Sequence, residues 1–303
     1  MKIVVSGSTG LIGSPLVEAL TQRDYEVVRL VRRPTGTGRR EALWDPERGT
    51  IDRAALEGAA VVINLAGENV FGRWSDAKKQ RIRDSRVGGT RLISETLAGL
   101  AKRPATLLAA SAIGYYGDRG DETLTERSAP GDDFLAEVAR DWEAATQPAA
   151  RAGIRVVNMR FGIVLSPAGG ALGKMLPPFR LGLGGPIGSG KQYVSWIERG
   201  DLVNAILHLM NTAHLEGPVN LTAPTPVTNR EFAATLGKVL GRPAVVTVPA
   251  FALRMAFGAE GAAMMQSSQR VVPERLVASG FACAFQTIAP ALRHLLAPSE
   301  GLR

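Results

Sequence analysis

A strand, a glycine-rich turn and a helix follow one another at the very start of the chain. Residues 3–5 form an apolar, β-branched run, residues 6–13 read Ser-Gly-Ser-Thr-Gly-Leu-Ile-Gly, and apolar residues at helical spacing come next. A buried strand that enters such a turn and leaves it as a helix is the context of a dinucleotide-binding fingerprint. The order therefore predicts that the chain begins as the first unit of a parallel α/β sheet.

The three glycines of the turn have separate expected roles. Gly7 allows a tight turn, Gly10 lets backbone N–H groups approach a pyrophosphate, and Gly13 lets the helix pack closely on the strand. The helix N-terminus adds unpaired N–H donors and a partial positive charge. The spacing is G-x-x-G-x-x-G, and the alternative is a glycine-rich turn without a ligand. The cofactor-binding candidates here are Gly7, Ser8, Thr9, Gly10, Leu11, Ile12 and Gly13.

Composition limits the class of protein. With 303 residues and 45% hydrophobic residues, the chain can form one large or two modest globular domains. It has no apolar stretch of about 20 residues and no signal-peptide pattern, so neither a membrane span nor export is expected. The single cysteine, Cys283, excludes an intrachain disulfide and fits a reducing, cytoplasmic location. The net charge of +8 favours anionic ligands, but no basic stripe with aromatic residues indicates nucleic-acid binding.

Strand-like and helix-like segments alternate through the first 165 residues. Apolar runs at 3–5, 27–31, 61–65, 106–110 and 155–160 predict strands, and the segments 14–22, 76–100 and 133–152 have helical patterns. This alternation predicts a doubly wound, Rossmann-type parallel sheet with helices on both faces. Its ligand is expected beyond the carboxyl ends of the strands.

The pattern changes after residue 165. Residues 166–192 are rich in Gly and Pro, which predicts an excursion with little regular structure. A helix at 201–211, with Asp201 as its N-cap, and a strand at 219–221 return to the sheet. We predict a cofactor-binding domain over residues 1–225 and a smaller C-terminal substrate lobe over 226–303.

Two arginines follow the second predicted strand. NAD enzymes of this kind place Asp or Glu there to bind the ribose 2′-hydroxyl, whereas this chain has Arg32 and Arg33. A guanidinium pairs with a 2′-phosphate that a carboxylate would repel. The position predicts NADP(H) over NAD, and the alternative is a pair of solvated turn arginines.

Several further motifs accompany the glycine turn. They include Asn64-Leu-Ala-Gly67, Ser85-Arg-Val-Gly-Gly-Thr90, Ser111-Ala-Ile-Gly-Tyr-Tyr-Gly117, Arg160-Phe-Gly-Ile-Val-Leu165 and Asn220-Leu-Thr-Ala-Pro224. Together they resemble the extended or atypical short-chain dehydrogenase/reductase superfamily. The resemblance is to its nucleotide-sugar-epimerase-like subfamily with a small C-terminal domain of unknown function, and it covers nearly the whole chain.

The resemblance implies further cofactor contacts. Leu65, Ala66 and Gly67 would line the cofactor with their backbone. Arg86 falls where extended members often carry an asparagine beside the cofactor, and it would meet a phosphate or an acidic substrate. The alternatives are a plain turn at the end of a strand and a surface arginine.

The catalytic pattern of this superfamily is incomplete. Typical members use Ser, Tyr and Lys, with the last two in a Tyr-x-x-x-Lys motif on one helix face. Ser111 fits the serine, but Ala136 and Arg140 occupy the other two positions. Tyr115, Tyr116 or Tyr193 would have to supply the proton, unless the chain lacks the standard chemistry. Tyr115 and Tyr116 also read as packing residues.

The catalytic candidates are therefore Ser111, Tyr116 and Arg140, the last also a cofactor contact. Glu126 is the best candidate among the nearby carboxylates for a structural hydrogen bond, and no histidine spacing predicts a metal site. The sequence predicts an NADP-binding oxidoreductase or epimerase-like protein for a small or nucleotide-linked substrate. A non-catalytic NADP-binding sensor or partner-binding module is the alternative, because Ala136 cannot transfer a proton. A homodimer is left open.

Overall fold

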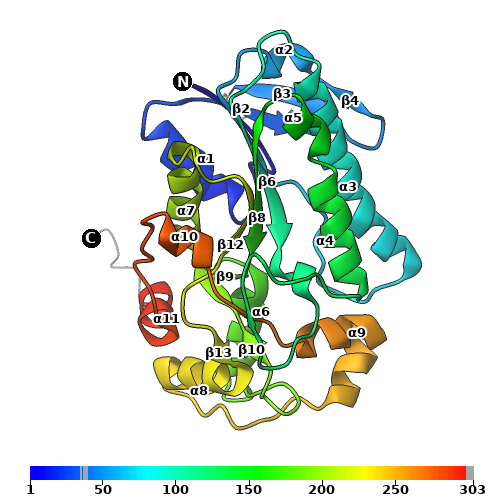
Figure 1. The fold of residues 1–303 in the computed structure, drawn as a ribbon. Helices are drawn as coiled ribbons and strands as arrows, with labels where there is room; N and C mark the ends of the chain where they lie inside the picture. The colour runs from blue at the N-terminus through cyan, green and yellow to red at the C-terminus, as the bar shows by residue number, and fades with distance from the viewer. Residues whose placement is uncertain (35, 37–39, 298–303) are drawn as a thin grey trace.

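The computed structural model describes residues 1–34, 36 and 40–297, and its centre is an eight-stranded sheet (Figure 1). The last six residues of the predicted substrate lobe lie outside the described residues. The strand order is β12-β8-β6-β5-β1-β2-β3-β4, and only the β3–β4 pair is antiparallel. The strands are β1 (Lys2–Ser6), β2 (Glu26–Val31), β3 (Glu41–Asp45), β4 (Thr50–Ile51), β5 (Val61–Asn64), β6 (Thr106–Ala112), β8 (Arg155–Phe161) and β12 (Gly217–Leu221).

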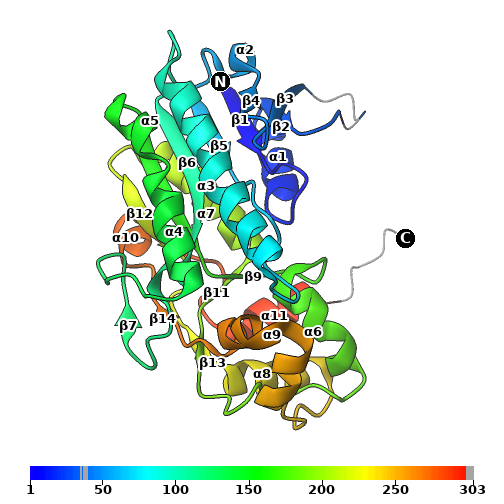
Figure 2. The same cartoon turned by 90° about the vertical axis from the view of Figure 1, so that its right-hand side faces the viewer.

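Helices cover both faces of the sheet. Helices α1 (Gly13–Thr21) and α7 (Arg199–Asn211) lie on one face, and α3 (Asp76–Ala98), α4 (Phe134–Ala144) and α5 (Gln147–Arg151) lie on the other (Figures 1 and 2). Successive strand residues point to opposite faces: Ile3 and Val5 enter the core with α1, whereas Val4 packs in the core that includes Ile93 of α3. The predicted Rossmann-type, doubly wound fold is confirmed.

The chain order of the strands reverses between β1 and β5. Ser6, at the end of β1, pairs with Leu30 of β2 on one side and with Asn64 of β5 on the other. Ligands of open α/β sheets bind at such a switch point, outside the carboxyl ends of the strands. The register therefore brings the glycine turn and the segments after β2 and β5 to one edge.

A second core lies beyond this edge, at the bottom of Figure 1. Helices α6 (Gly170–Arg180), α8 (Asn229–Leu240) and α11 (Ile288–Leu296) share it, with Phe179 and Leu292 among its buried side chains. The remaining elements are α2 (Arg53–Leu56), η1 (Ile113–Tyr116), β7 (Thr123–Leu124), β9 (Ile163–Leu165), β10 (Tyr193–Val194), β11 (Trp196–Glu198), β13 (Val227–Thr228), α9 (Ala250–Gln266), β14 (Arg270–Val271) and α10 (Glu274–Ala278).

The prediction of little regular structure over 166–192 is wrong for its first half. Helix α6 forms there because Leu172, Leu176 and Phe179 recur at helical spacing and are all buried. Gly169 and Gly170 stand at the start of α6, Pro177 and Pro178 come only near its end, and the glycines from Gly182 onward follow the helix.

Two helix boundaries also differ from prediction. The segment 133–152 is two helices, because α4 ends at Ala144 and α5 begins at Gln147, just before Pro148. The N-cap of α7 is Glu198, whose side chain accepts a hydrogen bond from the Asp201 N–H at 2.9 Å. The Asp201 carboxylate instead accepts the N–H groups of residues 284 and 285, each at 2.9 Å.

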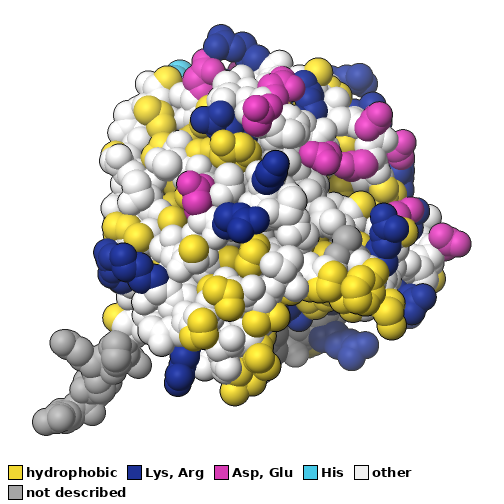
Figure 3. All heavy atoms as spheres, turned by 90° about the horizontal axis from the view of Figure 1, so that it is seen from below, with side chains coloured by type: hydrophobic (Ala, Val, Ile, Leu, Met, Phe, Trp, Pro, Cys, Tyr) yellow, Lys and Arg dark blue, Asp and Glu magenta, His cyan; other side chains and the backbone are white. Residues whose placement is uncertain are grey.

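Seen from the end that carries α6, α8 and α9, the surface mixes hydrophobic and charged side chains (Figure 3). Exposed apolar residues near this end include Leu181, Leu183, Val245, Phe251 and Met255. Among the described helices, none combines the length and the apolar character that a membrane span requires.

Candidate cofactor and catalytic site

The glycine turn after β1 is shaped by contacts within the protein. Gly7 has a φ of +66°, and a Cβ atom there would lie 2.7 Å from the carbonyl carbon and oxygen of Leu65. A Cβ at Gly13 would lie 2.2 Å from the Gly7 oxygen, so the close approach that requires this glycine is to the turn itself. Gly10 is exposed, and its Cβ would meet only the Gly7 oxygen, at 3.3 Å.

This turn leaves backbone donors unused. The N–H groups of Leu11, Ile12 and Gly13 make no hydrogen bond to any described residue, whereas Gly10 N–H bonds to the Gly7 oxygen at 3.0 Å. Unsatisfied donors are the property of a helix N-terminus that binds anions. The turn can therefore hold a phosphate group at the switch point of the sheet.

A buried arginine supports the turn from β2. Arg29 is 4% exposed, its Nε donates to the Ser8 hydroxyl at 3.1 Å, and its Nη1 lies 3.4 Å from a Glu41 oxygen. The Ser8 side chain, which the sequence placed in the cofactor site, is therefore buried against Arg29. A charged residue inside an apolar strand was the signal for this contact, because buried charges need partners.

Arg32 and Arg33 follow β2 and are exposed. Neither makes a hydrogen bond or ion pair with another described residue. A hydrogen bond from Lys78 is the main cause of a lowered pKa at Glu68, and the charge of Arg32 contributes to it. Arg32 is thus close to the segment after β5 and is available to an anionic ligand.

A chain of buried hydrogen bonds holds the end of β5. Ser6 Oγ donates to Asn64 Oδ1 at 2.5 Å, and Asn64 Nδ2 donates to Thr90 Oγ1 at 2.8 Å. Trp142 Nε1 also donates to Thr90 Oγ1 at 2.8 Å. These contacts join β1, β5, α3 and α4 beneath the turn formed by Leu65, Ala66 and Gly67. The backbone of that turn is therefore held in place beside the glycine turn.

Arg86 lies against this second turn from α3. Its Nη1 donates to the carbonyl oxygens of Glu68 and Ile82 at 3.0 and 3.2 Å, and its guanidinium lies 5.0 Å from the ring centre of Trp142. Burial lowers the pKa of Arg86 to about 10. Arg86 is half-buried, so the simple surface-arginine reading does not describe it.

Ser111, at the end of β6, belongs to a buried ionic network. Its hydroxyl donates to Glu143 Oε1 at 2.7 Å, and the same carboxylate receives Arg160 Nε at 2.7 Å and Nη2 at 2.8 Å. Burial opposes the charge of Arg160, but the hydrogen bonds and the charge of Glu143 outweigh it and raise the Arg160 pKa. Neither Glu143 nor Arg160 was among the predicted site residues, although an arginine within the apolar strand β8 was a visible signal.

Tyr116 lies in the same network but has no exposed surface. Its hydroxyl donates to Asn220 Oδ1 at 2.7 Å and accepts from Arg160 Nη1 at 3.0 Å. Burial raises its pKa to about 12. Both hydrogen-bonding roles of the hydroxyl are filled within the protein, which disfavours Tyr116 as a proton donor to substrate.

Tyr115 is placed differently. It is half-buried, its ring lies 3.5 Å from the guanidinium carbon of Arg160, and its hydroxyl makes no hydrogen bond within the described part of the chain. Tyr193 belongs to the β10–β13 pair and lies 5.0 Å from the guanidinium carbon of Arg270. Of these tyrosines, Tyr115 combines a free hydroxyl with contact to the network of Ser111.

Arg140 stands apart from this network. It is exposed on α4, and it makes no ion pair or hydrogen bond with any described residue. Ala136 is fully buried, so the helix face at the Tyr-x-x-x-Lys positions offers no proton-transferring group. The structure brings Ser111 and Tyr116 together through Arg160 and Glu143, but not Arg140.

Three other sequence expectations concern Glu126, Cys283 and a metal site. Glu126 accepts hydrogen bonds from the N–H groups of Asn220 and Arg275 at 3.0 and 3.3 Å, which confirms its structural role. Burial raises its pKa and raises that of the Cys283 thiol to about 12. Over residues 1–34, 36 and 40–297, no three His, Cys, Asp or Glu side chains gather as metal ligands would.

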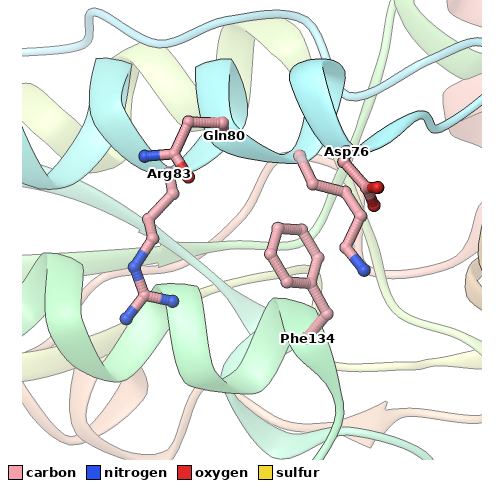
Figure 4. A pocket seen from close by; sticks show the side chains of 5 residues that line it. Asp76, Gln80, Arg83 and Phe134 are labelled. Carbon is pink, nitrogen blue, oxygen red and sulfur yellow. The ribbon is translucent and has the colours of Figure 1, made fainter.

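A hollow of about 370 Å³ lies between α3 and α4 (Figure 4). Its cations already have partners: Lys79 pairs with Glu260 at 2.8 Å, and Arg83 pairs with Asp141. Its lining contains neither the glycine turn nor η1, so the hollow is separate from the candidate site. The lining residues are Asp76, Lys79, Gln80, Arg83 and Phe134.

Two family models match the chain. Residues 3–221 match the NAD dependent epimerase/dehydratase family, and residues 248–295 match a domain of unknown function, DUF1731. An epimerase family protein of Mycobacterium bovis is 44% identical over 291 residues, which cover 96% of each chain.

Solved structures are also similar. The crystal structure of the human epimerase family protein SDR39U1 with NADPH has a TM-score of 0.90 at 36% identity, covering 97% of this chain and 99% of the human one. A nucleoside-diphosphate sugar epimerase from Corynebacterium glutamicum has a TM-score of 0.79 at 38% identity, covering 98% of this chain and 58% of the other.

Proposed function

Because the chain belongs to the NAD dependent epimerase/dehydratase family and carries the DUF1731 domain after it, we propose that it is an NADP(H)-dependent, epimerase-like oxidoreductase. Its substrate is a small or nucleotide-linked carbonyl or alcohol. Residues 1–225 bind the cofactor and residues 226–303 complete the substrate side. The single buried cysteine supports a reducing compartment such as the cytoplasm.

The observation that carries this proposal is that the N–H groups of Leu11, Ile12 and Gly13 donate to no described residue. They lie at the switch point of the sheet, where the cofactor diphosphate would accept hydrogen bonds from them. Arg32 and Arg33 stand one strand away, exposed and without partners among the described residues, and would bind the 2′-phosphate. The NADPH in the crystal structure of the human relative supports the same choice of cofactor.

For the chemical step, we assign proton transfer to Tyr115. The guanidinium of Arg160 lies against the Tyr115 ring, and a cation there stabilises the phenolate that forms when the proton leaves. Glu143 holds Arg160 by two hydrogen bonds and accepts a third from the Ser111 hydroxyl, whose oxygen would in turn accept a hydrogen bond from the hydroxyl of an alcohol substrate. When bound, the nicotinamide of NADP(H) would supply or accept the hydride at the substrate carbon.

Cofactor titration tests the first half of the proposal. NADPH and NADH are titrated into the protein by fluorescence, with an Arg32→Ala, Arg33→Ala double variant and an Arg151→Ala control on α5. Loss of charge-assisted hydrogen bonds should weaken NADPH binding by about 10- to 100-fold. NADH binding and the control should be unchanged. Equal binding of both cofactors by the wild type would refute the assignment of the 2′-phosphate site.

Turnover tests the second half. NADPH oxidation is followed with a panel of carbonyl compounds and nucleotide sugars, and Tyr115→Phe is compared with Tyr116→Phe. We expect kcat to fall by at least about 100-fold for Tyr115→Phe, the low end of what a positioned proton donor contributes. If Tyr116→Phe abolishes turnover and Tyr115→Phe does not, the roles of the two tyrosines are reversed.

A second candidate is a non-catalytic NADP(H)-binding sensor. Ala136 and Arg140, which is exposed and pairs with no described residue, support it, because the family's proton-transfer pair is absent from α4. Tight NADPH binding without turnover across the panel, and with Tyr115→Phe indistinguishable from the wild type, would favour the sensor.

A further inference from the structure

Arg86 is a partly buried cation that forms no ion pair with a described residue. Its Nη1 is occupied by the carbonyl oxygens of Glu68 and Ile82. Its Nε and Nη2 donate to no described residue. The Glu68 carboxylate is attractive to Arg86, but that carboxylate is held by Lys78 Nζ at 2.6 Å. Three N–H donors of the guanidinium, one on Nε and two on Nη2, are therefore left over.

Such an arrangement is costly without a ligand. Removing a guanidinium from water disfavours its charged form, and burial is the main reason that the Arg86 pKa is lowered to about 10. Buried charges in proteins are normally paired. The ring of Trp142 offers only the weaker cation–π attraction, at 5.0 Å. A second negative group would complete the surroundings of Arg86.

The position of Arg86 favours a ligand as that group. A Cβ added at Gly67 would lie 3.5 Å from the Arg86 Cζ, so the guanidinium lies along the backbone of the turn after β5. That turn is at the switch point, beside Gly7 of the glycine turn. The Arg86 guanidinium also lies 5.0 Å from the ring centre of Trp142, and the next residue of α4, Glu143, binds Ser111. Arg86 therefore contacts both the proposed cofactor turn and the helix that carries Glu143.

We propose that Arg86 binds an oxyanion of the substrate, a carboxylate or a phosphate, through its free Nε and Nη2. This inference rests on the proposed function. The cofactor's diphosphate is accounted for by the glycine turn, and its 2′-phosphate by Arg32 and Arg33. Arg86 is a surplus cation at the same edge, so the substrate class it selects is anionic. Nε and Nη2 form the edge of the fork that can hold two oxygens of one oxyanion.

The test uses the full-length protein saturated with NADPH. Inorganic phosphate and malonate are titrated by calorimetry into the wild type, Arg86→Met and Arg91→Met. The two variants remove one guanidinium each from α3, and Arg91 is exposed and has no partner in the part of the chain that the structure describes. We expect binding of at least one anion to the wild type and Arg91→Met, and at least about tenfold weaker binding to Arg86→Met. The Kd of NADPH should be the same in all three proteins.

Each other outcome overturns the inference. A loss of NADPH affinity in Arg86→Met would assign Arg86 to a cofactor phosphate, and loss of NADH and NADPH binding together would specify the diphosphate. Anion binding that is absent, or equal in all three proteins, would leave Arg86 without a ligand role. Failure of the wild type to bind NADPH would be a failure of the proposed function instead, and it is seen before any anion is added.

A measurement on the unaltered chain covers the case in which Arg86→Met does not fold. Phenylglyoxal modifies arginine, and mass spectrometry follows its reaction at Arg86 and Arg91 in the NADPH-saturated protein. Phosphate or malonate should slow the reaction at Arg86 and leave that at Arg91 unchanged. Equal rates at Arg86 with and without both anions would refute the inference.

Discussion

The ion pair between Glu143 and Arg160 should be one of the most consequential polar contacts in this protein. Arg160 is 2% exposed, and the Glu143 carboxylate receives three hydrogen bonds, two from Arg160 and one from Ser111. Glu143→Gln keeps the shape of the side chain but removes its negative charge. The new amide nitrogen, itself a donor, would face a donor of Arg160 or Ser111. Breaking one side of a buried pair costs about 3–5 kcal/mol, so we expect a loss of about 3 kcal/mol or more in the free energy of unfolding.

Urea denaturation of the cofactor-free protein measures this loss. Glu122→Gln is the matched control, because Glu122 pairs with Arg119 at 2.7 Å on the surface and should contribute less than about 1 kcal/mol. The double variant Arg160→Met, Glu143→Leu has neither charge. Its loss in the free energy of unfolding should therefore be well below the sum of the losses in Arg160→Met alone and Glu143→Leu alone. A Glu143→Gln loss as small as that of the control, or strictly additive losses, would refute the reasoning.

Three further predictions concern the turn and the buried titratable groups. Gly13→Ala should unfold or strongly destabilise the protein because its Cβ would meet the Gly7 oxygen at 2.2 Å, whereas Gly10→Ala should keep its thermal stability and lose NADPH affinity. Burial raises the pKa of Glu126 in the folded state. Its contribution to the free energy of unfolding is therefore complete below pH 4.5, where the carboxyl is neutral in both states, and it is lost as the pH rises through the folded-state pKa. Glu126→Gln should flatten that decline in denaturation curves taken at increasing pH. Cys283, whose thiol pKa burial raises to about 12, should react with a thiol reagent in urea but not in the native protein, and rapid native labelling would contradict this.

Local sequence predicted most of the strands in the cofactor half of the fold, although not β3 or β4. Strands such as β1 and β5 are short apolar runs whose side chains face two cores, and the glycine turn has the steric requirements that the spacing implied at Gly7 and Gly13. The positive φ of Gly7 and the close approach of Gly13 to the Gly7 oxygen are local features that a pattern can reveal, whereas the approach of Leu65 to Gly7 is a long-range contact. The hidden helix α6 shows the limit, because glycine and proline at its ends obscured a buried face that only the second core makes favourable.

Some residues of the candidate site could be predicted from local sequence and others could not. Arg32, Arg33 and the turn after β5 follow directly from the ends of predicted strands. The pairing of Ser111 with Glu143, and of Arg160 with Tyr116, joins residues far apart in the chain, as does the contact of Arg29 with Ser8. No local pattern specifies such partners, although a lone arginine in an apolar strand indicates that the arginine has a partner elsewhere in the chain.

A repeating order of strand and helix, with glycines where the backbone needs them, was enough to predict the sheet and the edge at which a ligand is expected, because steric limits and hydrophobic periodicity act over a few residues. Only the packing of β6, α4 and β8 decided which tyrosine hydroxyl is hydrogen-bonded inside the protein. Tyr115 and Tyr116 are neighbours in the chain, yet packing buries the Tyr116 hydroxyl between Asn220 and Arg160 and leaves the Tyr115 hydroxyl without a hydrogen bond to any described residue. Hydrogen-bond satisfaction in a low-dielectric interior depends on distant partners, and chain folding alone provides them.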